Sequence, residues 1–85
     1  MPYIVDEQRS KFDKYLDQLP EFSDKGELEY CIFKLMIRYI STRKWRYSIL
    51  HDCAYAAMHC ADEFRRRFLD KREDEAIEKN GDIIC

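Results

Sequence analysis

The stretch from Glu27 to Ile40 constrains the fold more than any other part of the chain. Nothing in it breaks a helix, and its length suits a helix better than a strand. On a helical wheel of about 100° per residue, four polar residues share one narrow arc: Glu27, Lys34, Arg38 and Ser41. The apolar positions cover more than twice the stripe of about 100° that a surface helix needs. We therefore expect this helix to be buried on two sides.

The apolar residues of this helix fall into two groups. One group forms a single face, made of Leu28, Cys31, Ile32, Leu35 and Tyr39. The second carries the apolar surface further round, through Tyr30, Phe33, Met36, Ile37 and Ile40. Two neighbouring helices of one small chain cannot cover both groups, so the second group is a candidate oligomer interface. We expect a homo-oligomer, a dimer at least, formed through this helix or the one that follows it.

Length and composition predict one helical domain spanning residues 1–85, near the size at which a single core is only marginally stabilising. Two glycines and two prolines leave little room for loops, which favours helices. The net charge of −2 argues against general nucleic-acid binding, because a duplex binder needs a broad basic surface. We expect no membrane span and no signal peptide. A cytoplasmic location follows, with reduced thiols at Cys31, Cys53, Cys60 and Cys85.

Local signals place the other helix ends. Asp6 is a plausible N-cap for a first helix that runs to about Leu19 and is ended by Pro20. Asp24, with Glu27 three residues later, resembles a capping box for the central helix. That helix runs to about Ser41 and is followed by a connector over residues 41–46.

A third helix is expected from about Tyr47 to Asp70 or beyond. Its predicted core face consists of Leu50, Cys53, Ala54, Ala57, Ala61, Phe64 and Phe68. Periodicity does not decide whether residues 71–80 continue this helix or form a separate one. Gly81 is the expected left-handed C-cap, and the apolar tail of residues 83–85 either folds back or meets a partner. The fold class is therefore all-α: a small antiparallel bundle of three main helices and a short C-terminal helical element.

The first candidate site is a basic and aromatic cluster around the connector. It consists of Arg38, Arg43, Lys44, Trp45, Arg46 and Tyr47. Guanidinium groups bind phosphate in a bidentate way, and aromatic rings stack on nucleobases, so this cluster suits an anionic nucleotide. The structural alternative is a solvated turn in which Trp45 caps the core and the cations stabilise a helix C-terminus.

The second candidate is one face of the third helix. It consists of His51, Tyr55, Met58, His59, Asp62 and Arg66. The two histidines are separated by about 12 Å of helical rise, so they cannot share one metal ion, and no metal or cofactor is predicted. The face is an ordinary half-exposed surface, a binding site or a subunit interface. The neighbouring run Arg65–Arg66–Arg67 spans more than half of the helix circumference and is not expected to converge on one target.

No catalytic constellation stands out, and we expect a protein that is not an enzyme. His51, Asp52 and Cys53 have residue types suited to nucleophilic catalysis, but adjacent helical positions point in different directions. With only two glycines, the chain has no Gly-rich phosphate loop.

Several short pieces spread along the chain resemble an uncharacterised family of small proteins from tailed phages and prophages. They are Met1-Pro-Tyr-Ile4, Gly26-Glu-Leu with Tyr30, Glu63-Phe64 followed by Arg66-Arg67, Glu73-Asp74 with Ile77-Glu78, and Asn80-Gly-Asp82. That family usually carries a Pro-Tyr pair where this chain has Lys71-Arg72, and such a pair would break a helix.

The resemblance implies a phage accessory protein acting in the cytoplasm of an infected bacterium, with no catalytic residue to carry over. The expected function is non-enzymatic binding, for example a counter-defence protein that sequesters an anionic nucleotide signal. The alternative is an inhibitor or adaptor that binds a host protein through a helical surface.

Overall fold

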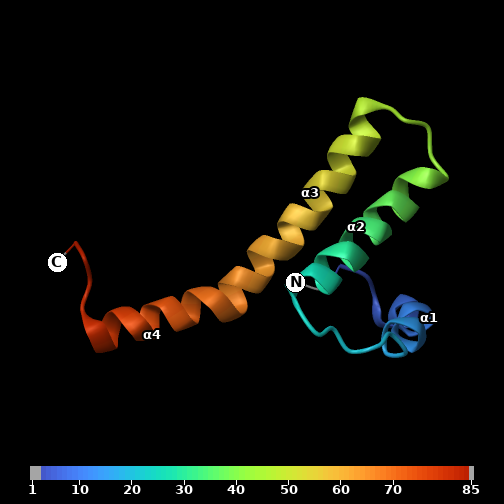
Figure 1. Ribbon diagram of the computed structural model, residues 1–85. Coiled ribbons are helices and arrows are strands. Elements are labelled where there is room, and N and C mark those ends of the chain that lie inside the picture. Colours follow the sequence, from blue (N-terminus) through green and yellow to red (C-terminus); the bar gives the residue numbers. More distant parts are fainter. Residues whose placement is uncertain (1–2, 85) are drawn as a thin grey trace. The chain divides into compact units, whose positions relative to one another are not determined.

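All regular structure in residues 3–84, the part that this computed structural model describes, is helical (Figure 1). The elements are α1 (Asp6–Leu16), α2 (Lys25–Ser41), α3 (Tyr47–Phe64), the π-helical segment η1 (Arg65–Leu69) and α4 (Asp70–Asn80). The last three join into one continuous helix of 34 residues. The all-α prediction is confirmed, and residues 71–80 continue the third helix, in which no proline interrupts the hydrogen bonds.

The chain divides into two compact units, Met1–Tyr30 and Cys31–Cys85. In the first unit, α1 and its N-cap lie one residue earlier than predicted. Val5 occupies the N-cap position with extended backbone, and Asp6 stands in the first turn, where its charge favours the helix N-terminus. Asp6 also forms an ion pair with Arg9 at 2.7 Å.

The first helix ends at Leu16 rather than Leu19. The N–H groups of Gln18 and Leu19 donate to carbonyls three residues back, at 3.2 Å each, so the chain tightens into turns before Pro20. A residue that precedes proline is disfavoured in the helical region, which is why the turns come first.

The start of α2 follows the predicted capping box, except that the Glu27 side chain bonds to the residue before the N-cap. The Glu27 N–H donates to Asp24 Oδ1 at 2.9 Å, so Asp24 acts as the N-cap. The Glu27 carboxylate accepts a 2.6 Å bond from the Ser23 N–H, one residue before the cap, instead of from the cap residue itself. Both bonds satisfy backbone donors that would otherwise lack a partner at the helix start.

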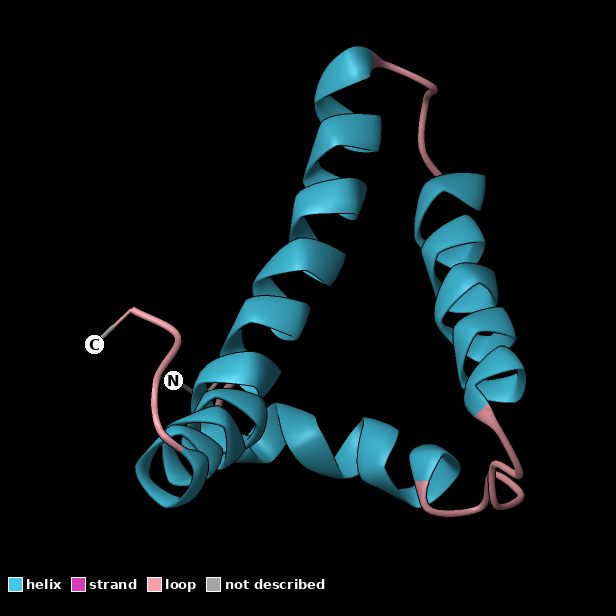
Figure 2. Cartoon of the chain, turned by 60° about the vertical axis from the view of Figure 1, so that its left-hand side comes forward, coloured by secondary structure: helices cyan, strands magenta, loops and turns pink. Residues whose placement is uncertain are grey.

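In the second unit, α2 and α3 run in opposite directions on either side of the connector (Figure 2). Their contact centres on Ile40 and Cys53, each 8% exposed, the two buried hydrophobic residues among those described. The Cys53 thiol donates to the Met36 carbonyl at 3.5 Å and so ties the two helices together. Met36 on α2 and Ile49 and Ala57 on α3 are half-buried along the same line.

The contact line differs from the predicted core face of α3. Ile49 belongs to it, whereas Leu50, Ala54, Ala61, Phe64 and Phe68 are exposed. Phe64 and Phe68 contact each other instead, with ring centroids 4.9 Å apart. A broad apolar arc has several directions in which it can pack, and the wheel alone does not choose among them.

The central helix is not buried on two sides within this chain. Met36 and Ile40, assigned from sequence to the candidate oligomer interface, lie toward α3 in the same molecule. The other three members, Tyr30, Phe33 and Ile37, are exposed, and so are Leu28, Ile32, Leu35 and Tyr39 on the other group. Large apolar stripes therefore remain uncovered on both sides of the contact line.

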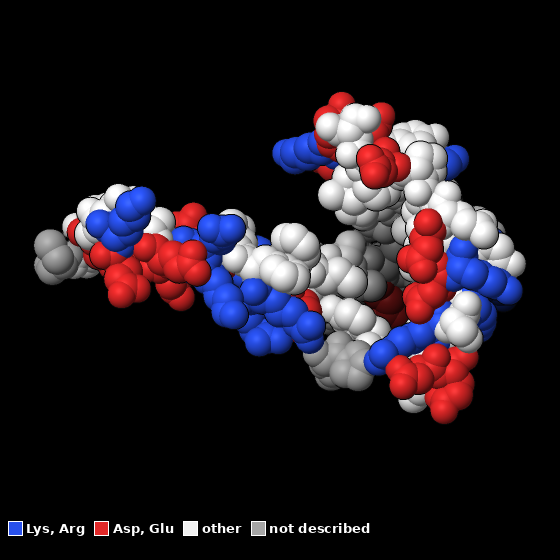
Figure 3. All heavy atoms as spheres, turned by 90° about the horizontal axis from the view of Figure 1, so that it is seen from below, with Lys and Arg blue, Asp and Glu red and all other residues white. Residues whose placement is uncertain are grey.

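The end of the long helix is strongly charged and capped by Gly81. Lys and Arg atoms alternate with Asp and Glu atoms over α4 (Figure 3). Gly81 has the expected positive φ of 87°, but its ψ of 151° is extended rather than left-handed helical. Its N–H donates to the Ile77 carbonyl at 2.7 Å. Ile83 is 99% exposed, so the tail does not fold back, and Cys85 lies outside the described residues.

Within residues 3–84, no helix combines the length and the apolar character needed to cross a membrane.

The Asp24 cap generates the first testable prediction. Replacing Asp24 with Ala removes the acceptor for the Glu27 N–H and should lower the free energy of unfolding by about 1 kcal/mol. Urea denaturation at one fixed protein concentration measures the change. Asp17→Ala, outside the cap of α2, is the matched control and should change stability by much less. Equal losses in the two variants would contradict the cap assignment.

The thiols give a second prediction. Cys53 is buried, Cys31 half-buried and Cys60 exposed, so a thiol reagent should label them in the order Cys60, Cys31, Cys53. We expect Cys60 to react at least about tenfold faster than Cys53, because Cys53 must wait for local opening. Mass spectrometry of time points measures the rates, and denaturant should equalise them. Equal rates in the folded protein would undo the contact assigned to Cys53.

Candidate functional site

The connector is a hydrogen-bonded turn that holds two aromatic rings in solvent. The Arg43 N–H donates to the Ile40 carbonyl at 3.1 Å, and the Arg46 N–H to the Lys44 carbonyl at 2.8 Å. Trp45 is 74% exposed and Tyr47 82% exposed. The alternative in which Trp45 caps the core is therefore wrong, because the ring lies outside.

The cations of the connector cluster are not equivalent. The Arg43 guanidinium lies over the Tyr39 ring, 3.9 Å from its centroid, and also donates to the Tyr39 carbonyl. Arg43 thus stabilises the C-terminus of α2, as the structural alternative proposed for the cations. Arg38 stands earlier, in the last turn of α2, which leaves Lys44 and Arg46 as the cations next to Trp45.

The start of α3 adds a feature that the sequence reasoning missed. Arg46 is its N-cap residue, no side chain caps the first turn, and that turn contains no acidic residue. The first N–H groups of a helix have no intrahelical acceptor and carry partial positive charge, so they favour an anion. The signal was present in the sequence: an arginine occupies a position where Ser, Thr, Asp or Asn is preferred.

The second candidate face is a ladder of rings along α3, formed by Tyr47, His51, Tyr55 and His59. The ring centroids of Tyr47 and His51 are 5.6 Å apart. His51 and Tyr55 stack at 4.2 Å, and Tyr55 meets His59 edge-on at 6.1 Å. Spacing of four residues brings side chains together on a helix, which explains the ladder. On the wheel it lies about opposite the Cys53 contact line, so it faces away from α2.

Tyr47, assigned from the sequence to the connector cluster alone, is also the first ring of the ladder, so the cluster and the ladder meet at this residue. The sequence predicts two separate candidate sites, because one is a loop motif and the other is one face of a helix. Asp62 continues the ladder's side of the wheel toward the carboxyl end of α3. Arg66 falls in the same direction, but its guanidinium is already engaged by Glu63.

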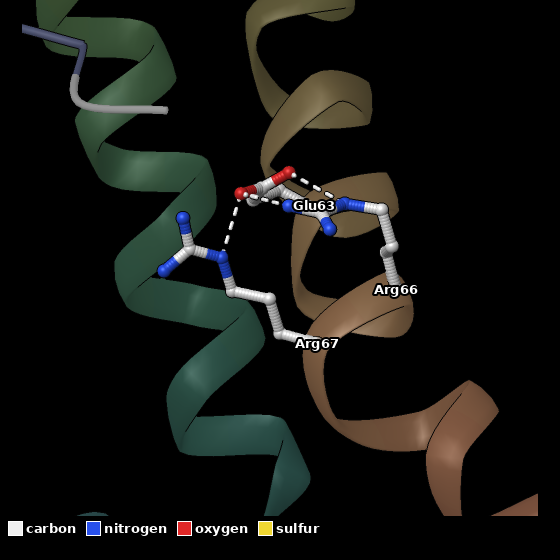
Figure 4. Close-up of polar contacts among 3 residues, drawn as sticks. All are labelled: Glu63, Arg66 and Arg67. Carbon is white, nitrogen blue, oxygen red and sulfur yellow. Dashed lines mark hydrogen bonds and ion pairs between the residues drawn. The ribbon is translucent and has the colours of Figure 1, made fainter.

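Glu63 is held by two arginines (Figure 4). Arg66 approaches its carboxylate with two bonds, of 2.9 and 3.3 Å, and Arg67 with one of 2.6 Å. Residues three and four positions along a helix lie on either side of residue i, so both reach the same carboxylate. Two of the three arginines thus share one carboxylate, and the expectation that all three do not converge on one target is not contradicted.

The pKa of Glu63 is lowered from 4.5 to about 2; the hydrogen bonds from Arg66 are the largest cause, and the hydrogen bond from Arg67 is a smaller one. The same contact raises the pKa of Arg66. This cluster leads directly into η1, where the Asp70 N–H donates to the Arg65 carbonyl five residues back. Short π-helical segments of this kind recur at functional sites.

The residue types considered for catalysis do not come together. His51 lies in the ladder, whereas the Cys53 thiol is buried and donates to the Met36 carbonyl. Within residues 3–84, no group of three or more His, Cys, Asp or Glu side chains is placed to hold a metal ion. The groups that the cluster and the ladder expose are aromatic rings and cations.

A family model described as "Domain of unknown function (DUF6899)" matches residues 1–83. The chain belongs to this family. The DUF6899 match includes both the connector cluster and the ladder, and it agrees with the resemblance to an uncharacterised family. No curated protein and no solved structure matches the chain.

The Glu63 contact predicts a pH dependence. The folded-state pKa is lowered, so the stabilisation is fully present above the unfolded pKa of about 4.5 and is lost as pH falls through about 2. The stability difference between the wild type and Glu63→Gln should therefore be constant above about pH 5 and shrink toward pH 2.

NMR titration of the Glu63 carboxyl carbon measures the cause directly. In an Arg66→Gln variant the pKa should rise toward 4.5, because Arg66 supplies the largest part of the lowering. A wild-type Glu63 that titrates near 4.5 would show that the two arginines do not hold it in solution.

Proposed function

We propose that this chain is a non-enzymatic binding protein that holds an anionic, base-containing ligand, of the nucleotide class, at the connector between α2 and α3. The observation that carries this proposal is the exposure of Trp45 and Tyr47 beside Lys44 and Arg46. Large rings in solvent contribute nothing to a core, and a ligand with a flat base gives them a partner.

Each group in the connector has a distinct role in this proposal. Trp45 and Tyr47 stack on the base, because every nucleobase presents a π-face. The Arg46 guanidinium and the Lys44 ammonium attract phosphate, Arg46 in a bidentate way. The uncapped N–H groups at the start of α3 supply further donors for the same charge. Arg43 keeps the turn in place through Tyr39.

The biological setting rests on the resemblance to small proteins of tailed phages and prophages. In that setting the chain acts in the cytoplasm of an infected bacterium as an accessory protein. Sequestering a nucleotide signal of host defence then requires only tight binding, and no catalytic group is needed. Membership of the DUF6899 family is consistent with this role and assigns no activity.

Calorimetry at moderate salt tests the proposal, with cyclic dinucleotides, linear dinucleotides and nucleoside triphosphates as probes. Arg46→Glu should abolish binding of whichever probe gives heat, because it reverses a charge at the phosphate. Trp45→Ala should weaken that binding by about 1–3 kcal/mol if the ring stacks on the base. Both variants should retain the wild-type helical signal by circular dichroism.

Lys71→Glu is the matched control, because it makes the same change of charge on α4, away from the connector. It should leave binding unchanged. If Lys71→Glu weakens binding as much as Arg46→Glu, the effect is net charge and not a site. Heat from none of the probes would contradict the nucleotide assignment.

The ladder supports a second candidate, an inhibitor or adaptor that binds a host protein through a helical surface. The observation that favours it is the run of ring contacts from Tyr47 to His59 on the side of α3 turned away from α2. Aromatic side chains are enriched in protein interfaces. Capture of one host protein that is lost in Tyr55→Ala and kept in Trp45→Ala, with no nucleotide heat, would establish this role instead.

A further inference from the structure

The contact between α2 and α3 leaves one side of this helix pair apolar and uncovered. On the α2 wheel, Phe33 and Ile37 lie about 40–80° past the contact line, measured in the direction in which residue numbers rise around the helix. On the α3 wheel, Leu50 and Ala61 lie past the contact line in the same rotational direction. Because both helices are right-handed and run antiparallel, equal rotational sense places these residues on the same side of the pair.

This side, the paired face, consists of Phe33 and Ile37 from α2 and Leu50, Ala54, Ala61 and Phe64 from α3. Phe33 is 62% exposed and Phe64 61% exposed. Tyr30 stands one turn before Phe33 and is also exposed. No charged residue falls within these arcs of the two wheels, and the two alanines allow a close approach by another helix.

We infer that the paired face is covered by the same face of a second copy of this chain. The first reason is stability. Ile40 and Cys53 are the hydrophobic residues that the described part of the chain buries, and so small a core does not sustain a domain of this size. A cover needed for folding must be present whenever the chain is, and a second copy meets that requirement.

The second reason is the character and size of the surface. In a two-fold contact the same patch lies on both sides of the interface, so a face without charges avoids like-charge repulsion. At their observed exposure, the rings of Phe33, Phe64 and Tyr30 alone offer roughly 300–450 Å². With the aliphatic and alanine positions, the surface approaches the about 800 Å² per partner of a standard stable interface.

The inference goes beyond the proposed function and does not depend on it. The ladder lies on the side of α3 away from α2, and Trp45 lies in the connector, so a dimer through the paired face leaves both accessible. Loss of the dimer and loss of nucleotide binding are therefore separate results.

Sedimentation equilibrium and thermal unfolding of the full chain, over about a hundredfold range of concentration, test the inference. We expect a mass of about twice the 10.4 kDa of one chain and a melting temperature that rises with concentration. Phe33→Asp and Ile37→Asp should remove the dimer mass, and with it much of the helical signal, because each buries a charge without a partner.

Tyr55→Asp is the matched control, since it places the same charge on the ladder side. It should retain the dimer mass and the concentration-dependent melting. A wild-type chain that stays folded at 10.4 kDa, with a melting temperature independent of concentration, would overturn the inference and leave the face to a different partner. Loss of the dimer in Tyr55→Asp but not in Phe33→Asp would equally overturn it.

Discussion

The second unit depends on one narrow line of contact between α2 and α3. Ile40 fills its connector end, and the Cys53 thiol reaches the Met36 carbonyl farther along. This line fixes the rotation of both helices about their axes. The rotation in turn decides which apolar stripes stay in solvent, and it turns the ring ladder away from α2. Few atoms maintain the line, so groups outside it, or outside the single chain, must supply the remaining stabilisation.

Local chemistry made the start of α2 predictable. The side chain of Asp24 and the backbone of Glu27 meet within four residues, and no distant contact is needed to place that start. The break between α2 and α3 at residues 42–46 also follows from local signals, whereas the sequence left open whether the helix continues through Lys71 and Arg72. The packing direction of α3 was less predictable. Ile49 and Leu50 are adjacent in the sequence and both belong to a broad apolar arc of the helix. Only the partner helix decides which of the two is buried.

The candidate site was predictable in composition and not in arrangement. The residue types of the connector predict a cluster of cations and rings. Only the turn geometry shows that Arg43 contacts Tyr39, whereas Arg46 stands at the start of α3. Spacing of four residues predicts that Tyr47, His51 and Tyr55 share a side, yet it does not say that the rings stack. Glu63 was one of several acidic partners considered for the arginine run, but the sequence alone does not show that Arg66 and Arg67 lie on either side of its carboxylate and share it.

The π-helical segment Arg65–Leu69 has a consequence for how this chain tolerates changes in length. A bond spanning five residues, such as that from the Asp70 N–H to the Arg65 carbonyl, accommodates one residue more per turn than the regular four-residue bond. The long helix therefore absorbs an additional residue at this point without breaking. Deleting one residue here would restore the regular pattern and leave the direction of α4 nearly unchanged relative to the ring ladder, whereas the same deletion in a regular part of the long helix would turn α4 by about 100°. Residues 65–69 thus preserve the angular phase between the aromatic part of the helix and its charged part.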